Sequence, residues 1–325
     1  MRPNAYRSAP LSLRLLHGAA LVILSFVASV AFCEELVDRE IRAALLKRPD
    51  GQIARIETVY NDIFITKRRD LMAMSFRLKG RYYTESVTNL ADPDDLPGRY
   101  TWMMTVGAAY PHELKSILMI GLGGGTISTY LGRFMPDVSI DTIEIDPGVI
   151  AAAKRYFGIR ETERVRYLDG DARVFLNRSR KTYDLILVDA FNGSTVPFHL
   201  ATREFYTLLK ERLTPGGVAT FNVVEGTKLY ASTLVTLRSV FPSVHVFPSG
   251  QGVIAVAAAS ATPDGDVLAR RAAGLQQRYN FRFALPSLLE QRAEGTPAGG
   301  GELLTDDFAP VNLHNAVREP MRRTK

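Results

Sequence analysis

The sequence predicts an α/β protein built on a Rossmann-type, mostly parallel sheet, with a small antiparallel β-region before it. First, the run SILMIGLGGGTISTYLGRF at 116–134 places an apolar strand before a glycine turn that opens a helix. Second, DTIEID at 141–146 ends the next strand and brings an acid about twenty residues after the turn. Third, apolar strands and helical segments then alternate to residue 258.

The composition excludes several functional classes. The formal net charge is +6, but the basic residues are scattered, apart from a cluster at 318–325 that we interpret as a solvated tail. Because the chain carries no RNA-binding or zinc-finger signature, we expect no nucleic-acid partner. Cys33 is the single cysteine, which excludes an internal disulfide framework and a cysteine-ligated zinc, and we expect no metal site.

The amino end has the features of a targeting segment. Arg2, Arg7 and Arg14 precede an apolar run at 18–32, a pattern typical of a secretory signal peptide or a single membrane anchor over residues 1–33. The charge bias places the rest of the chain outside the cytoplasm. We therefore expect an exported or membrane-anchored protein, in the periplasm or at the cell membrane. The alternatives are a start codon assigned too early, an apolar helix packed on the domain, and a cytoplasmic location.

The remaining chain divides by pattern. Residues 34–51 are charged and predict a helix or linker, and residues 52–112 form the small β-region, whose apolar–polar alternation is typical of short antiparallel strands. A helix is predicted at 100–109. Residues 113–315 form the Rossmann-like domain and 316–325 the basic tail.

The large domain is predicted element by element. Strands are expected at 117–121, 139–144, 165–168, 185–189, 218–223, 244–247 and 251–258. Helices are expected at 126–134, 148–157, 172–177, 202–212, 228–241 and around 268–279. The last two strands are too close for a helical crossover and should pair antiparallel. This is a class I methyltransferase-like sheet, in which ligands lie beyond the carboxyl ends of the strands.

The glycine turn and the acid after it predict an adenosine site. Gly121, Gly123 and Gly125 lack a Cβ, so the backbone can turn sharply and approach a ligand closely. The Glu144 carboxylate can accept hydrogen bonds from both ribose hydroxyls. The alternative is an α/β sheet whose glycines only serve a tight turn.

Further polar residues follow the next strands. Asp171, with Ala172 after it, is placed to accept a hydrogen bond from an adenine amine, and it can also cap the following helix. Asp189 ends an apolar strand, an unfavourable place for a charge unless a partner pairs with it. His199 lies near the predicted mouth, where it is either a polar loop contact or a base.

From about residue 56 to residue 256 the chain resembles the spermidine synthase (polyamine aminopropyltransferase) family. The resemblance lies in ILMIGLGGGT, IEIDPGVIAAAKRYF, RVRYLDGDARVFL, YDLILVDAF, TREFYTLLKERLTPGG and FNVVEG. The ending LLTDDFAPVN is similar to a subgroup often fused to transporter segments. The resemblance implies transfer of an aminopropyl group from decarboxylated S-adenosylmethionine, a co-substrate rather than a tightly bound cofactor, to a small-molecule amine such as putrescine. It also implies a homo-oligomer.

The resemblance assigns roles to individual residues. Asp189 is the base that takes a proton from the attacking amine, and Tyr100 lies near that amine. Glu144 binds the ribose and Asp171 the adenine. Glu225 corresponds loosely to an acid in the amine channel.

The chain departs from the family pattern at the amine end. Gly124 stands where the family has the aspartate that holds the aminopropyl ammonium, and Asn192 replaces a second substrate-facing aspartate. Thr101 and Trp102 follow the tyrosine, where the family has His or Gln and then Glu. If the carboxyl segment folds over the crevice, Asp306 and its neighbour Asp307 replace these missing carboxylates. The alternative is a solvated turn.

The leading hypothesis is therefore an aminopropyltransferase with altered amine selectivity, which predicts an acidic cleft between the β-region and the sheet. A second hypothesis is a methyltransferase, or other alkyl transferase, that uses intact S-adenosylmethionine. A third is a non-catalytic module that binds a nucleoside, a polyamine or a partner protein.

Overall fold

The computed structural model describes residues 39–191, 196–225, 228–250, 252–293 and 300–308. The chain divides into two units, residues 1–47 and 48–325. The described part of the first unit contains a helix over 39–46. The predicted signal or anchor segment and the basic tail lie outside the described residues. Within the ranges that are described, no helix is long and apolar enough to cross a membrane.

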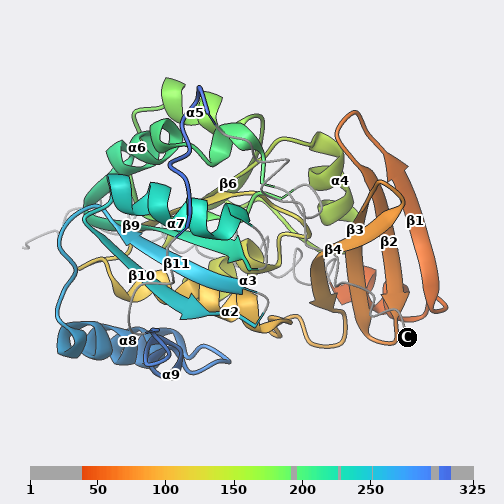
Figure 1. The fold of residues 1–325 in the computed structure, drawn as a ribbon. Helices are drawn as coiled ribbons and strands as arrows, with labels where there is room; N and C mark the ends of the chain where they lie inside the picture. The colour runs from red at the N-terminus through yellow and green to blue at the C-terminus, as the bar shows by residue number, and fades with distance from the viewer. Residues whose placement is uncertain (1–38, 192–195, 226–227, 251, 294–299, 309–325) are drawn as a thin grey trace, which may run out of the picture. The chain divides into compact units, whose positions relative to one another are not determined.

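The second unit begins with a four-stranded antiparallel meander, drawn in red and orange in Figure 1. Its strands are β1 (Gly51–Glu57), β2 (Asp62–Arg68), β3 (Leu71–Leu78) and β4 (Arg81–Asn89). At the β3–β4 turn, Lys79 and Gly80 have φ of 51° and 78°, the left-handed geometry that matches the twist of a two-residue hairpin. The antiparallel strands predicted for this region are confirmed.

The large sheet has seven strands in the order β10-β11-β9-β8-β5-β6-β7. They are β5 (Ser116–Ile120), β6 (Ser139–Glu144), β7 (Val165–Asp169), β8 (Tyr183–Val188), β9 (Leu213–Val224), β10 (Ser243–Pro248) and β11 (Gly252–Ala258). Strands β5 to β9 pair in parallel, while β11 pairs antiparallel with both β9 and β10. The mostly parallel sheet with one reversed strand is confirmed.

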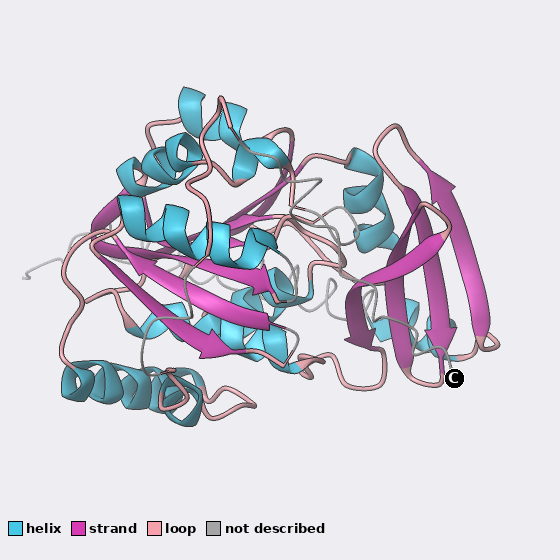
Figure 2. Ribbon diagram, in the orientation of Figure 1, coloured by secondary structure: helices cyan, strands magenta, loops and turns pink. Residues whose placement is uncertain are grey.

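Helices cover both faces of this sheet (Figures 1 and 2). They are α2 (Arg99–Met104), η1 (Thr105–Ala109), α3 (Thr126–Phe134), α4 (Pro147–Tyr156), α5 (Ala172–Arg178), η2 (Phe198–Leu200), α6 (Arg203–Glu211), α7 (Lys228–Val240), α8 (Gly265–Tyr279) and α9 (Leu285–Leu289). The helix predicted at 100–109 is α-helical only to Met104 and continues as a 3₁₀ turn. The short helices η2 and α9 were not predicted, since neither is long enough to show a period.

The central strands of the large sheet are largely buried, and two carboxylates lie at the carboxyl ends of its strands. Ile117, Leu118, Leu185 and Ile186 in β5 and β8 are fully buried, as expected for parallel strands covered on both faces. Glu144 is the last residue of β6, and Asp189 follows the last residue of β8. The fold therefore collects Glu144 and Asp189 at the carboxyl edge, where the sequence predicts a ligand site.

Candidate active site

A cavity, partly open to solvent, lies at the carboxyl ends of the parallel strands. The large sheet and the segments after its strands contribute Gly121, Gly123, Glu144, Asp171, Ala172, Asp189 and His199. The small sheet and its β1–β2 loop contribute Tyr60, Asn61, Phe76, Glu85 and Ser86, and α2 contributes Tyr100. The predicted acidic cleft between the β-region and the large sheet is confirmed.

Gly121 allows two strand ends to approach each other. Its φ is +92°, and a Cβ at this position would overlap the carbonyl oxygen of Asp189. The Asp189 amide donates a 2.9 Å hydrogen bond to the carbonyl oxygen of Ile120. Only glycine fits this close contact. The glycine turn thus fixes the backbone of Asp189 as well as forming a wall of the cavity.

Gly125 serves the turn, one of the two roles predicted for it. It takes φ of +70° just before α3, and a Cβ there would lie 2.6 Å from the Ile159 side chain. It does not belong to the cavity lining. Its left-handed backbone and tight packing end the turn, so direct cofactor contact by Gly125 is not supported.

Glu144 is held by backbone amides. Its Oε2 accepts a hydrogen bond from the Leu122 amide at 2.9 Å, and its Oε1 accepts one from the Asp146 amide at 3.0 Å. Burial raises the pKa of Glu144, while these amide hydrogen bonds oppose the rise. Because a carboxylate can accept about four hydrogen bonds, each oxygen keeps capacity for a ligand hydroxyl.

Asp171 both caps a helix and faces the cavity. Its Oδ1 accepts a hydrogen bond from the Val174 amide at 2.8 Å, at the start of α5. Its Oδ2 lies 2.7 Å from His199 Nε2. An ionised carboxylate only accepts, so His199 donates from Nε2. This pairing favours the interpretation of His199 as a polar contact that fixes η2 beside the cavity.

Asp189 and Tyr100 face the same space from different elements. Asp189 follows β8 and accepts a 2.9 Å hydrogen bond from Asn222 Nδ2, and burial raises the pKa of its carboxyl group. The pKa of Tyr100 is also raised, first by burial and then by the negative charges of Asp189 and Glu85. Tyr100 therefore stays protonated at neutral pH and can donate a hydrogen bond.

Asn222, Glu85 and Ser86 were not predicted as site residues. The register of β8 and β9 pairs Val188 with Phe221, which places Asn222 beside Asp189. An asparagine in the apolar run ATFNVV was a usable signal, since a polar group in a buried strand needs a partner. Glu85 and Ser86 gave no such signal, because a polar residue in an alternating strand usually faces solvent.

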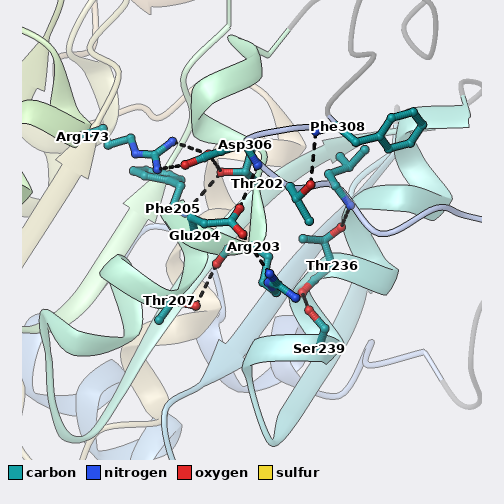
Figure 3. A network of polar contacts seen from close by, with 12 residues as sticks. Arg173, Thr202, Arg203, Glu204, Phe205, Thr207, Thr236, Ser239, Asp306 and Phe308 are labelled. Atoms are coloured by element: carbon teal, nitrogen blue, oxygen red, sulfur yellow. Dashed lines mark hydrogen bonds and ion pairs between the residues drawn. The ribbon is translucent and has the colours of Figure 1, made fainter.

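The carboxyl segment does not deliver Asp306 to the cavity. Its Oδ1 and Oδ2 accept hydrogen bonds from Arg173 at 2.7 and 2.5 Å, and Thr202 Oγ1 donates to Oδ1 at 2.8 Å (Figure 3). The hydrogen bonds from Arg173 lower the pKa of Asp306. Arg173 also donates to the carbonyl oxygen of His199 at 3.1 Å. The predicted substrate contact by Asp306 is therefore not supported, since this carboxylate holds Arg173 instead.

The other two predicted substrate residues do not join the described site. Glu225 is exposed just after β9 and does not belong to the cavity lining. Burial raises the pKa of Tyr230, and the negative charge of Glu225 adds to this rise. Asn192 lies outside the described residues.

The cavity is strongly anionic. Glu85, Glu144, Asp171 and Asp189 line it, whereas its lining has no lysine or arginine among the residues that the structure describes. A cavity lined by carboxylates favours a ligand that supplies positive charge. The geometry suits a cationic ligand with an adenosine-like end.

Comparison with known proteins gives a consistent assignment. Residues 99–249 match the family model described as the spermine/spermidine synthase domain. The polyamine aminopropyltransferase of Vibrio vulnificus is 34% identical over 271 residues, covering 79% of this chain and 89% of that protein.

Solved structures share the fold. The spermidine synthase from Thermotoga maritima matches with a TM-score of 0.60 and 21% identity, over 75% of this chain and 84% of that one. Human methyltransferase-like protein 13 in complex with SAH matches with a TM-score of 0.52 and 23% identity, over 57% and 93% of the two chains. With the 34% identical relative covered over most of its length, the chain belongs to the spermine/spermidine synthase family, the polyamine aminopropyltransferases.

Proposed function

We propose that the protein transfers an aminopropyl group from decarboxylated S-adenosylmethionine to a small-molecule amine. The observation that carries this proposal is the cavity lined by four carboxylates, with no lysine or arginine among its described lining residues. Decarboxylated S-adenosylmethionine has a sulfonium and an ammonium, whereas the intact donor adds a carboxylate that these acids would repel.

The donor is oriented from its adenosine end. Glu144, held by two backbone amides, accepts hydrogen bonds from the ribose hydroxyls. Asp171 accepts from the adenine amine while His199 and the start of α5 fix it. The sulfonium and its aminopropyl arm then extend toward Asp189 and Tyr100, which line the same cavity.

The transfer balances without an added reactant. The acceptor ammonium gives a proton to the carboxylate of Asp189, and the nitrogen lone pair attacks the aminopropyl carbon bonded to sulfur. The carbon–sulfur bond breaks, and sulfur keeps the electron pair as the neutral thioether of methylthioadenosine. Burial raises the pKa of Asp189, which brings this base closer to the pKa of the proton donor.

The experiment is a turnover assay on the purified chain. Decarboxylated S-adenosylmethionine is incubated with a panel of di- and polyamines, and methylthioadenosine and the extended amine are quantified. We expect the two products in equal amounts with at least one amine. If no amine of the panel yields a thioether, the proposal is wrong.

Methyl transfer is the second candidate, and the glycine turn favours it. Residue 124 is glycine, and the space beside it is filled by Phe157 and Ser86, so this turn offers no carboxylate to an aminopropyl ammonium. The same panel with intact S-adenosylmethionine tests it. A methylated amine with S-adenosylhomocysteine as co-product would establish this activity instead.

We also propose that residues 1–33 export the protein or anchor it in the membrane, and that it works as a homo-oligomer. Support for the first comes from the arginines before the apolar run at 18–32, and for the second from the resemblance to the family. A reporter fused to the carboxyl end gives the compartment, and light scattering gives the mass. A cytoplasmic reporter would contradict the first proposal, and a monomeric mass the second.

A further inference from the structure

The proposed donor brings two positive charges into the cavity, a sulfonium and an ammonium. Glu144 and Asp171 lie where the adenosine binds, held by the amides of Leu122, Asp146 and Val174. Asp189 serves the attacking amine. The ammonium at the end of the donor's aminopropyl arm still needs a counter-charge in this partly dry site.

The glycine turn does not supply that counter-charge. A Cβ built on Gly124 would lie 2.5 Å from Phe157 Cδ1 and 2.8 Å from Ser86 Oγ. Phe157 is buried at the end of α4, and Ser86 is buried in β4. The two side chains therefore occupy the volume into which a longer side chain at residue 124 would extend.

Glu85, the neighbour of Ser86, brings a carboxylate to the same region from β4. Ser86 packs against the turn, and its Oγ lies 3.3 Å from Thr126 Oγ1. The backbone oxygen of Glu85 would lie 3.6 Å from a Cβ on Gly123. Glu85 lines the same cavity as Gly121 and Gly123 of the turn.

Tyr100 connects Glu85 with Asp189. Its hydroxyl donates a 3.4 Å hydrogen bond to the backbone oxygen of Glu85. Burial raises the pKa of Tyr100, and the negative charges of Asp189 and Glu85 raise it further. Both carboxylates are therefore within electrostatic reach of one tyrosine, so one can pair with the donor ammonium while the other accepts the proton of the acceptor.

We propose that Glu85 binds the terminal ammonium of the donor and makes the site selective for the decarboxylated form. This inference rests on the proposed aminopropyl transfer. A carboxylate at this place attracts the ammonium of the decarboxylated donor and repels the carboxylate of the intact one. The selectivity for the donor thus comes from the small sheet rather than from the glycine turn.

The test separates the arm of the donor from its adenosine end. The full chain, as wild type, Glu85→Gln and Glu85→Asp, is titrated calorimetrically with decarboxylated S-adenosylmethionine and with methylthioadenosine, which lacks the arm. We expect Glu85→Gln to weaken donor binding at least about tenfold, the scale of a lost charge-assisted hydrogen bond. Methylthioadenosine should bind within about twofold of wild type, and Glu85→Asp should recover part of the loss.

Glu57→Gln is the matched control, since Glu57 is an exposed glutamate of the same sheet that lies 3.8 Å from Arg55. It should leave both affinities unchanged. Unchanged donor affinity in Glu85→Gln, or an equal loss for both ligands, would overturn the proposal. Turnover of the wild-type sample is measured in parallel. If wild type transfers no aminopropyl group, the proposed function fails as well, whereas active wild type with full donor affinity in Glu85→Gln removes only the role of Glu85.

Discussion

The two ends of the cavity are built in different ways. At the adenosine end, Glu144 and Asp171 are held by backbone amides at 2.8 to 3.0 Å, two of them from residues close in the chain and one from Leu122 in the glycine turn. At the amine end, Asp189 accepts from the side chain of Asn222, and Tyr100 and Glu85 come from separate elements. The adenosine end follows from local motifs, whereas the amine end depends on tertiary packing.

This difference has a consequence for chemistry. Hydrogen bonds from backbone amides orient the Glu144 and Asp171 carboxylates before a ligand arrives. At the amine end, burial raises the pKa of Asp189 and of Tyr100. The adenosine end is therefore suited to recognition, and the amine end to proton transfer and charge pairing.

The largest expected effect is at Asp189. Asp189→Asn removes the base but keeps an oxygen that can accept from Asn222, so transfer should fall by about 10³-fold, within the range of general base catalysis. Binding of the decarboxylated donor should change by less than about threefold, because the adenosine end is intact. Initial rates measure the transfer, and calorimetry measures the binding of the donor. Transfer above about a tenth of the wild-type rate would exclude Asp189 as the base.

The second effect is on stability and lies where the two sheets meet. Asp146 is buried, caps α4 through the Gly148 amide, and accepts hydrogen bonds from Thr58 Oγ1 and Asn61 Nδ2 at 2.7 and 2.8 Å. Asp146→Ala removes all three, so the free energy of unfolding should fall by about 3 kcal/mol. Urea denaturation measures it.

Glu113→Ala is the control for this variant, because Glu113 pairs with Lys115 at an exposed position. Glu113→Ala should lower the free energy of unfolding by less than about 0.5 kcal/mol. An equal loss in the two variants would show that Asp146 does not join the small sheet to the large one.

The third effect is on the pH dependence. The pKa of Asp189 is raised by burial, and the active form is the carboxylate. The value of kcat/KM should therefore fall on acidification at a pH above the ordinary carboxylate pKa of about 3.9.

The raised pKa of Asp189 also affects stability. The folded protein binds this proton more tightly than the unfolded chain, so the free energy of unfolding decreases as the pH rises through the raised pKa. Asp189→Asn should therefore have a higher Tm than wild type at pH 8, and this difference should vanish below about pH 4. A lower Tm of the variant at pH 8 would contradict the assigned direction.

The smallest effect concerns the carboxyl segment. Asp306 accepts hydrogen bonds from Arg173 (Figure 3). Arg173 also donates to the carbonyl oxygen of His199, whose ring nitrogen contacts Asp171. Asp306→Asn should raise the KM for the donor about threefold and leave kcat unchanged, since it loosens only the adenosine end. Asp307→Asn is the control. A change in kcat with constant KM would place Asp306 at the amine end instead.

The same contrast explains how far the sequence predicted the site. Gly121, Gly123, Glu144 and Asp171 follow strands whose periods are visible in the chain, and the structure places all of them on one cavity. The parallel order with a reversed β11 followed from the short connection between the last two strands.

The other site residues could not be predicted correctly, because their positions depend on contacts between segments that are distant in the chain. Glu85 reaches the cavity only because β4 packs on the glycine turn, and no local pattern of β4 shows this. Asp306 was predicted from charge alone, but Arg173 lies 133 residues before it in the chain and takes up its carboxylate. Gly125 shares the motif with its neighbours, yet the side chain of Ile159 packs where a Cβ would lie.

The most direct test of the central claim compares the two sulfonium donors. Wild-type protein is titrated calorimetrically with decarboxylated and with intact S-adenosylmethionine under the same conditions. Because the described cavity lining offers four carboxylates and neither lysine nor arginine, the decarboxylated donor should bind at least about tenfold more tightly. Equal affinity, or tighter binding of the intact donor, would contradict the account.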